Sequence, residues 1–423
     1  MMRFELVDYL HLVYKCIAAP PLSCTMYING ERKVVDTAIT SFTSKDVWRF
    51  SSNGKHSTGV FLEGGAPVRK AYFNAVANYK AWYEATKAGV PVEEVTTPAK
   101  DDGYKAGRAG LNNAQKQGIN LTIDRMMAGG VSLYQMAGFE ADDLLWTAYK
   151  QLRTSFPDAH IDIFTGDMDM LPMVDEYTSV YMRGNRTWAE PMCKQGFCTE
   201  CRDTCEKYGD DSCKIRREFK NYYEVTPDTW DEFISYRSAF KGYKIPYNSV
   251  YLFKMLRGDV SDNVPMVSKG WGPKKWNSII EQMEADGVDF ARLFRYDTPW
   301  ALVQPVLLKY FDQETVAFMM LNAEGIRPRS CMGELINLIP IPNENRSQID
   351  VSAVYETLKN GQTYTPGSEG ERSRAKIVYD CMKNGINPAI DLQLTVPAVP
   401  DLGRFQTSLN ELRINLPTKQ VTY

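Results

Sequence analysis

The sequence predicts an α/β protein in which a central, mostly parallel sheet is flanked by helices. Three short apolar runs lead into acidic residues, at 4–8, 57–63 and 159–169, and each has the length and composition of a strand. Segments with the apolar spacing of a helix, such as 141–152, lie between them. Strands that alternate with helices favour a parallel sheet. The carboxyl ends of the three strands should therefore meet at one edge, where such sheets bind ligands.

We divide the chain into four parts. Residues 1–182 form the α/β core, which includes an excursion with scattered basic residues at about 81–137. A cysteine- and charge-rich insertion follows at 183–224, and residues 225–330 have helical patterns with a Gly- and Pro-containing turn. We assign no role to the C-terminal extension at 331–423.

The composition is that of a globular protein in a reducing compartment. Hydrophobic residues make up 44% of the 423 residues and charged residues 24%, and no run approaches the roughly 20 apolar residues of a membrane span. The N-terminus lacks the pattern of a secretory signal. Nine irregularly spaced cysteines then favour a reduced, cytoplasmic protein. The net charge of −3 disfavours nucleic-acid binding unless the acids are concentrated in a metal site.

Acidic residues recur where a predicted strand ends or a helix begins. Each group alone has an ordinary explanation, since acids complement the start of a helix and aspartates are common in turns. Together they form a set of nine carboxylates: Asp8, Glu63, Glu140, Asp142, Asp143, Asp167, Asp169, Asp259 and Asp262.

Nine carboxylates at one edge of a sheet would repel one another and be driven toward protonation. Divalent ions relieve that cost, and an all-oxygen ligand set suits Mg²⁺ or Mn²⁺ better than zinc. Two such ions about 4 Å apart can activate water and stabilise the leaving oxygen of a phosphodiester. We therefore predict that the nine acids hold two ions, with Asp142 and Asp167 as catalytic residues.

Six segments in order between residues 4 and 280 resemble the 5′-nuclease family, which includes flap endonucleases, phage 5′→3′ exonucleases and the exonuclease domain of bacterial DNA polymerase I. The family's first strand and helix resemble FELVDYLHLVYK, and its segment with an acid, then Arg-Lys and Tyr-Lys, resembles GVFLEGGAPVRKAYFNAVANYK. Its acidic motifs resemble GFEADDLL, FTGDMDML and LRGDVSDNVPMV. Its helix-two-turn-helix resembles SKGWGPKKW at 268–276.

The resemblance implies a PIN-like nuclease core that cuts DNA or RNA–DNA near 5′ ends, in replication or repair. It implies that residues 81–137 form a helical arch. It also implies that Lys80 is a catalytic residue near the scissile phosphate, where it would stabilise the charge that develops on the phosphoryl oxygens; a solvated helix lysine is the alternative. The glycines of the 268–276 turn would also let backbone N–H groups approach phosphate. The candidate DNA-binding residues are Lys15, Arg69, Lys70, Lys80, Lys269, Gly270, Gly272, Lys274 and Lys275.

The sequence departs from the family pattern at three places. Glu63 stands where the family more often has Asp, and Pro273 lies inside the glycine turn. After Asp8 the family has small residues, whereas this chain has Tyr9, Leu10 and His11. We interpret His11 as a packed or hydrogen-bonded residue, with metal ligation as the alternative.

Five cysteines of the insertion form a separate candidate site. Cys198 and Cys201 have the spacing of a zinc knuckle, and a structural zinc would stabilise a loop that lacks a core of its own. Free thiols and disulfides are the alternatives. The candidate ligands are Cys193, Cys198, Cys201, Cys205 and Cys213.

Two other functions fit parts of the pattern. A PIN-like ribonuclease shares acids at the sheet edge, but the 256–276 segment argues against it. A non-catalytic DNA-binding replication protein could keep the fold, but would gain nothing from so many carboxylates.

Overall fold

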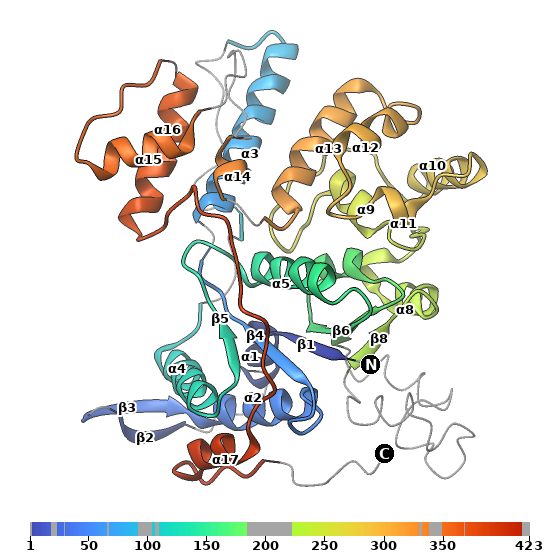
Figure 1. Cartoon of the computed structure of the whole chain (residues 1–423). Coiled ribbons are helices and arrows are strands. Elements are labelled where there is room, and N and C mark those ends of the chain that lie inside the picture. The colour runs from blue at the N-terminus through green and yellow to red at the C-terminus, as the bar shows by residue number, and fades with distance from the viewer. Residues whose placement is uncertain are drawn as a thin grey trace, which may run out of the picture.

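The computed structural model has the predicted sheet (Figure 1). It describes residues 2–17, 23–28, 30–65, 67–91, 104–105, 110–183, 222–329, 332–337, 349–367 and 369–416. The sheet has six strands in the order β5-β4-β1-β6-β7-β8, and β8 is antiparallel to β7 whereas the other neighbours pair in parallel. The strands are β1 (Arg3–Asp8), β4 (Ser57–Phe61), β5 (Ser132–Tyr134), β6 (His160–Thr165), β7 (Thr178–Arg183) and β8 (Tyr222–Val225).

Helices cover both faces of the sheet. Alternate residues of a strand point to opposite faces, so in β1 Val7 packs into one apolar cluster and Leu6 into the other. Both residues are fully buried, which is why the strands are almost continuously apolar. The Val7 face is covered by α1 (Tyr9–Ile17), α2 (Thr37–Phe50), α4 (Asn113–Ala128) and α17 (Leu402–Asn410), and the Leu6 face by α5 (Ala141–Ser155).

A second, helical layer lies beyond the carboxyl ends of the strands (Figure 1). One part follows β8 and packs around α9 and α13, and the other gathers around α3. Its helices are α3 (Pro67–Lys87), α8 (Trp230–Tyr236), α9 (Val250–Arg257), α10 (Pro273–Ala285), α11 (Phe290–Leu293), α12 (Trp300–Leu307), α13 (Gln313–Ile326), α14 (Met332–Asn337), α15 (Val351–Lys359) and α16 (Glu369–Lys383). Short 3₁₀ helices span Met168–Met173 and Ser238–Phe240.

The C-terminal extension is packed against the core at both of its ends. Helices α14 and α16 contact α3, and the chain then returns past β5 to α17, which packs on α4 (Figure 1). Along this path the carbonyl of Ala398 accepts a hydrogen bond from the N–H of Thr58 at 3.0 Å. Residues 331–423, to which the sequence assigned no role, therefore include elements of the folded core.

A hairpin of β2 (Ser23–Ile28) and β3 (Glu31–Asp36) projects beside α4 (Figure 1). Within the described parts of the chain, each helix is too short or too polar to cross a lipid bilayer.

Candidate metal centre

The predicted acids come together where the carboxyl ends of the strands meet the second layer. Strand β1 ends at Asp8, β4 ends two residues before Glu63, and β6 ends two residues before Asp167. The strands are parallel neighbours, with β1 between β4 and β6, so these three ends lie side by side. The start of α5 adds Glu140 as its N-cap residue and Asp142 in its first turn.

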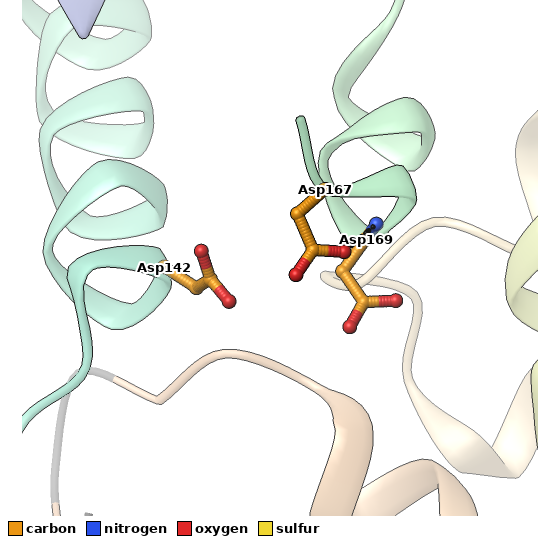
Figure 2. A group of neighbouring side chains, drawn as sticks. All are labelled: Asp142, Asp167 and Asp169. Carbon is orange, nitrogen blue, oxygen red and sulfur yellow. Dashed lines mark hydrogen bonds between the residues drawn. The ribbon is translucent and has the colours of Figure 1, made fainter. Parts of the chain in front are cut away.

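Three aspartates form the core of this group. Asp142, Asp167 and Asp169 each have a carboxylate oxygen within 4.8 Å of the others (Figure 2). Asp167 caps the 3₁₀ helix Met168–Met173, and its Oδ1 accepts the N–H of Asp169 at 2.9 Å. Burial raises the pKa of Asp142 well above its usual range, and the charge of Asp167 adds to the shift. Such crowding is what a divalent cation would relieve.

Asp8 and Glu63 extend the group toward β1 and β4. Asp8 Oδ2 accepts a hydrogen bond from Thr165 Oγ1 at 3.0 Å. Burial raises the pKa of Asp8 to about 6, with the Thr165 bond opposing and the charge of Asp167 adding to the shift. Burial raises the pKa of Glu63 to about 7, and repulsion from Glu140 contributes. Asp8 therefore interacts with Asp167, and Glu63 joins the group through Glu140 and Asp8.

One lysine lies inside this group on the side of α9. Lys254 is only 5% exposed, and its Nζ contacts Asp169 and lies 2.6 Å from Asp259 Oδ2 and 4.0 Å from Asp167 Oδ1. Burial alone would raise the pKa of Asp259, but Lys254 lowers it to about 2. Burial raises the pKa of Asp169 to about 7 even though Lys254 opposes the shift.

A tyrosine and a lysine reach the opposite side of the group. The Tyr104 hydroxyl lies 3.0 Å from Glu140 Oε2 and 3.2 Å from Asp262 Oδ2. Lys105 Nζ contacts Glu140, and the Lys105 N–H donates to the carbonyl of Asp262 at 3.0 Å. Burial would raise the pKa of Glu140, but Arg69 and Lys105 lower it below its usual value.

We call the following eight residues the acidic centre, because contacts or direct electrostatic interactions link them all: Asp8, Glu63, Glu140, Asp142, Asp167, Asp169, Asp259 and Asp262. Two lysines among the described residues contact different acids of this centre. Lys105 lies on the Glu63 and Glu140 side, Lys254 lies on the Asp169 and Asp259 side, and Asp142 lies between, within the influence of both Lys105 and Asp167.

The predicted phosphate-binding turn has the geometry that its sequence requires. Gly270 has φ +96°, a conformation that L side chains rarely adopt, and open space surrounds its Cα. Gly272 is the N-cap of α10, and Pro273 stands in the first turn, where its missing N–H costs nothing. Lys269, Lys274 and Lys275 are all exposed. The helix start therefore offers free backbone N–H groups beside three cations.

Comparison with known proteins finds similarity to 5′-3′ exonucleases. Residues 64–204 match the family model of the 5′-3′ exonuclease N-terminal resolvase-like domain, and this segment supplies the three aspartates of Figure 2. The family model covers about a third of the chain, and over this segment the chain is similar to 5′-3′ exonucleases. It is 26% identical over 226 residues to a thermostable DNA polymerase I of Thermus filiformis, covering 51% of this chain and 21% of the relative.

A second relative is a 5′-3′ exonuclease of Mycoplasma pneumoniae, 27% identical over 179 residues, which covers 42% of this chain and 47% of the relative. The chain thus spans about a fifth to about half of the length of these curated relatives. Among solved structures, the bacteriophage T5 D15 protein crystallised with metal ions is 11% identical, with a TM-score of 0.42 over 90% of this chain and 99% of that one. Human GEN1 in complex with Holliday junction DNA is 11% identical, with a TM-score of 0.30 over 97% and 90% of the two chains.

Arg69 lies elsewhere than the sequence predicts. It is 5% exposed, contacts Asp143 and lies 3.1 Å from Glu140 Oε2. Asp143 also accepts the N–H groups of Arg329 and Glu140, at 2.9 and 3.0 Å. The arginine is therefore a buried counter-ion of the acids rather than a surface contact for phosphate. Asp143 fixes the start of α5 instead of facing the open part of the acidic centre.

Lys80 also points away from the acids in this structure. Its Nζ donates to the carbonyls of Met266 and Val267, which precede the glycine turn, and burial lowers its pKa. Lys70, on the same helix, is exposed. His11 fits the packed interpretation, because its Nε2 lies 2.7 Å from the Tyr222 hydroxyl.

Within the predicted arch at about 81–137, α4 packs on α2 and β5 is a strand of the sheet. Two further predictions concern parts of the chain outside the described residues. The five cysteines of the candidate zinc site fall in residues 184–221, and the Lys15 side chain is also outside the description. The sequence did not predict that Lys105 and Lys254 contact the acids. Lys254 stands in the apolar run VYLFKMLR, and a lysine in such a run is the signal that could have pointed to a buried ion pair.

Proposed function

We propose that this protein is a structure-specific 5′ nuclease that hydrolyses phosphodiester bonds near the 5′ ends of DNA or RNA–DNA, in replication or repair. The observation that carries the proposal is the acidic centre at the edge of the sheet. The exposed turn at 268–276 supports it, since it suits a nucleic-acid backbone. We place the protein in the cytoplasm, because nine cysteines without a disulfide pattern suit a reducing compartment.

The donor set fits two divalent ions, Mg²⁺ or Mn²⁺. All ligand atoms are carboxylate oxygens, the type that hard cations prefer. Burial raises the pKa values of Asp8, Glu63 and Asp169, and a bound divalent ion would favour their charged forms. Lys105 and Lys254 contact different acids of the centre, and Asp142, Asp167 and Asp169 are acids close enough together to hold an ion.

The chemistry supplied by bound ions would be polarisation of water for attack and stabilisation of the leaving oxygen. The protein's own residues hold the site in place for that chemistry. Asp167 orders the 3₁₀ helix that carries Asp169, and Thr165 orients Asp8 through its hydrogen bond. Arg69 and Asp143 fix the first turn of α5, from which Asp142 extends.

We propose that Lys80 contacts the reacting phosphate when substrate binds. Helix α3 places it beside the 266–267 carbonyls at the entry to the glycine turn. An anionic phosphate is a stronger partner for an ammonium group than two neutral carbonyls. The exposed Lys70, Lys269, Lys274 and Lys275 would contact the backbone farther along, without reading its sequence.

The test is cleavage of a 5′-labelled flap substrate in Mg²⁺ and in EDTA. We expect cleavage in Mg²⁺ and no cleavage in EDTA. Asp142→Asn and Asp167→Asn should each lower the rate by more than about 100-fold, since even partners of metal ligands contribute about 10–100-fold. Duplex binding should survive, because the 268–276 turn is untouched. The matched control is Asp124→Asn on the exposed side of α4.

Two outcomes would contradict this function. Duplex binding without cleavage in Mg²⁺ would favour the non-catalytic DNA-binding alternative. Preference for single-stranded RNA without 5′-end dependence would favour the PIN-like ribonuclease.

A further inference from the structure

Tyr104 and Lys105 contact Glu140 and Asp262, and a metal ion bound by these acids would compete with that contact. They belong to the stretch between α3 and α4 and reach the acidic centre from outside the sheet. Tyr104 is 5% exposed, and its ring stacks on Phe73 with centroids 4.9 Å apart. Its hydroxyl donates toward Glu140 and Asp262. A stacked aromatic ring thus anchors this pair of residues at the acids.

The Lys105 ammonium group lies among these carboxylates, where a metal ion would bind. It contacts Glu140, and the charges of Asp142, Asp262 and Glu63 also act on it. These are the acids on one side of the centre. A single ammonium group balances one negative charge, whereas a divalent ion would balance two and bind several oxygens at once.

The backbone of Lys105 is in a conformation that needs support. Its φ is +56°, in the left-handed region that is unfavourable for a residue with a side chain. Its N–H bond to the Asp262 carbonyl and its ion pair with Glu140 oppose that cost. Residues in this conformation persist where their surroundings hold them, so losing the ion pair would favour release.

We propose that Tyr104 and Lys105 are a cationic plug, which fills one half of the acidic centre in the metal-free protein and is displaced by a divalent ion. The proposal rests on the metal centre of the proposed function. Lys105 and the ion compete for Glu140 and its neighbours, so binding of one weakens binding of the other by the same factor. Metal loading is thereby coupled to release of Tyr104 and Lys105 from the acids.

The experiment compares Lys105→Gln with the wild-type full-length chain after EDTA treatment. Mg²⁺ affinity is measured by calorimetric titration, and thermal unfolding is followed in EDTA and in excess Mg²⁺. Removal of the competitor should tighten Mg²⁺ binding by about tenfold, a typical coupling between two sites. The variant should unfold at a lower temperature than wild type in EDTA, where its acids lose a partner, and this deficit should disappear in Mg²⁺.

Two further variants sharpen the test. Tyr104→Phe keeps the ammonium but loses the hydroxyl contacts, so it should tighten Mg²⁺ binding by a smaller factor. Lys116→Gln, an exposed lysine on α4, should change neither measurement.

Unchanged or weaker Mg²⁺ binding by Lys105→Gln would overturn the proposal. An equal loss of thermal stability in both conditions would also overturn it, because that is the result of a purely structural ion pair. Flap cleavage by the wild-type protein is measured separately. Absence of cleavage with tighter Mg²⁺ binding in Lys105→Gln would refute the nuclease activity and leave the plug intact.

Discussion

Glu5 shows how a single buried carboxyl group is accommodated in the middle of the sheet. It lies on β1, is 1% exposed, and its Oε1 is 2.5 Å from His56 Nδ1. Burial raises the pKa of Glu5 well above its usual value, and the charge of Asp162 adds to the shift. Burial lowers the pKa of His56. A protonated Glu5 that donates to a neutral His56 satisfies both shifts.

The stability of the Glu5→Gln variant relative to wild type should therefore increase as pH rises. The folded protein keeps a proton on Glu5 that the unfolded chain releases near its ordinary pKa of 4.5. The stability that this proton gives is present below that pH and is lost as pH rises toward the folded pKa. Glutamine stays neutral throughout. The free energy of unfolding is measured by urea titration at about pH 5 and about pH 8. The difference between variant and wild type should shift in favour of the variant at the higher pH.

Glu176→Gln, at an exposed position, provides the control and should show no such trend. A difference between Glu5→Gln and wild type that is the same at both pH values would show that the carboxyl does not carry this proton.

The sequence predicted the positions of the acidic side chains better than those of the lysines and the arginine. An acid at the end of a strand or the start of a helix has its position set by local structure, so Asp8 and Asp142 could be placed from sequence. A lysine has a long flexible side chain that usually reaches solvent. Only the packing of α9 against the Met168–Met173 helix brings Lys254 into the site. The same holds for Arg69, whose burial comes from α5 and the 329 region.

At the scale of elements, local apolar patterns predicted the strands β1, β4 and β6 and the helix α5. They did not predict the part played by α17, which is a short helix far along the chain from its partners. Phe405 of α17 is fully buried and packs edge-on against Trp48 of α2, with ring centroids 6.2 Å apart. A side chain added at Gly129 would meet Phe405 at 2.7 Å. Such contacts depend on tertiary structure, which local patterns do not encode.

Phe405→Ala should destabilise the whole protein although it lies far from the acids in sequence. Loss of a fully buried phenylalanine costs about 3–5 kcal/mol. The measurement is the free energy of unfolding from urea titration. Leu402→Ala, at a position on the same helix that is 46% exposed, should stay within about 0.5 kcal/mol of wild type. If the two variants lose equal stability, α17 is not docked through Phe405.

At the scale of the whole molecule, a small net charge of −3 conceals a separation of charge. Acids gather inside one edge of the sheet, and exposed lysines lie at the 268–276 turn in the layer above it (Figure 1). Motif order along the chain predicted this arrangement, because each motif ends a strand or starts a helix at the same edge. The course of the C-terminal extension could not be predicted, since it packs against segments more than 250 residues away, as Ser408 does against Arg125 (283 residues).

The central claim is that the acidic centre holds divalent ions, and anomalous diffraction from crystals soaked in Mn²⁺ tests it most directly. We predict anomalous peaks among Asp142, Asp167 and Asp169, with Mn²⁺ about 2.1 Å from carboxylate oxygens, close to the distance for Mg²⁺. We also predict that Lys105 leaves Glu140. The claim is contradicted if saturating Mn²⁺ gives no peak at these aspartates while both lysines keep their carboxylate partners.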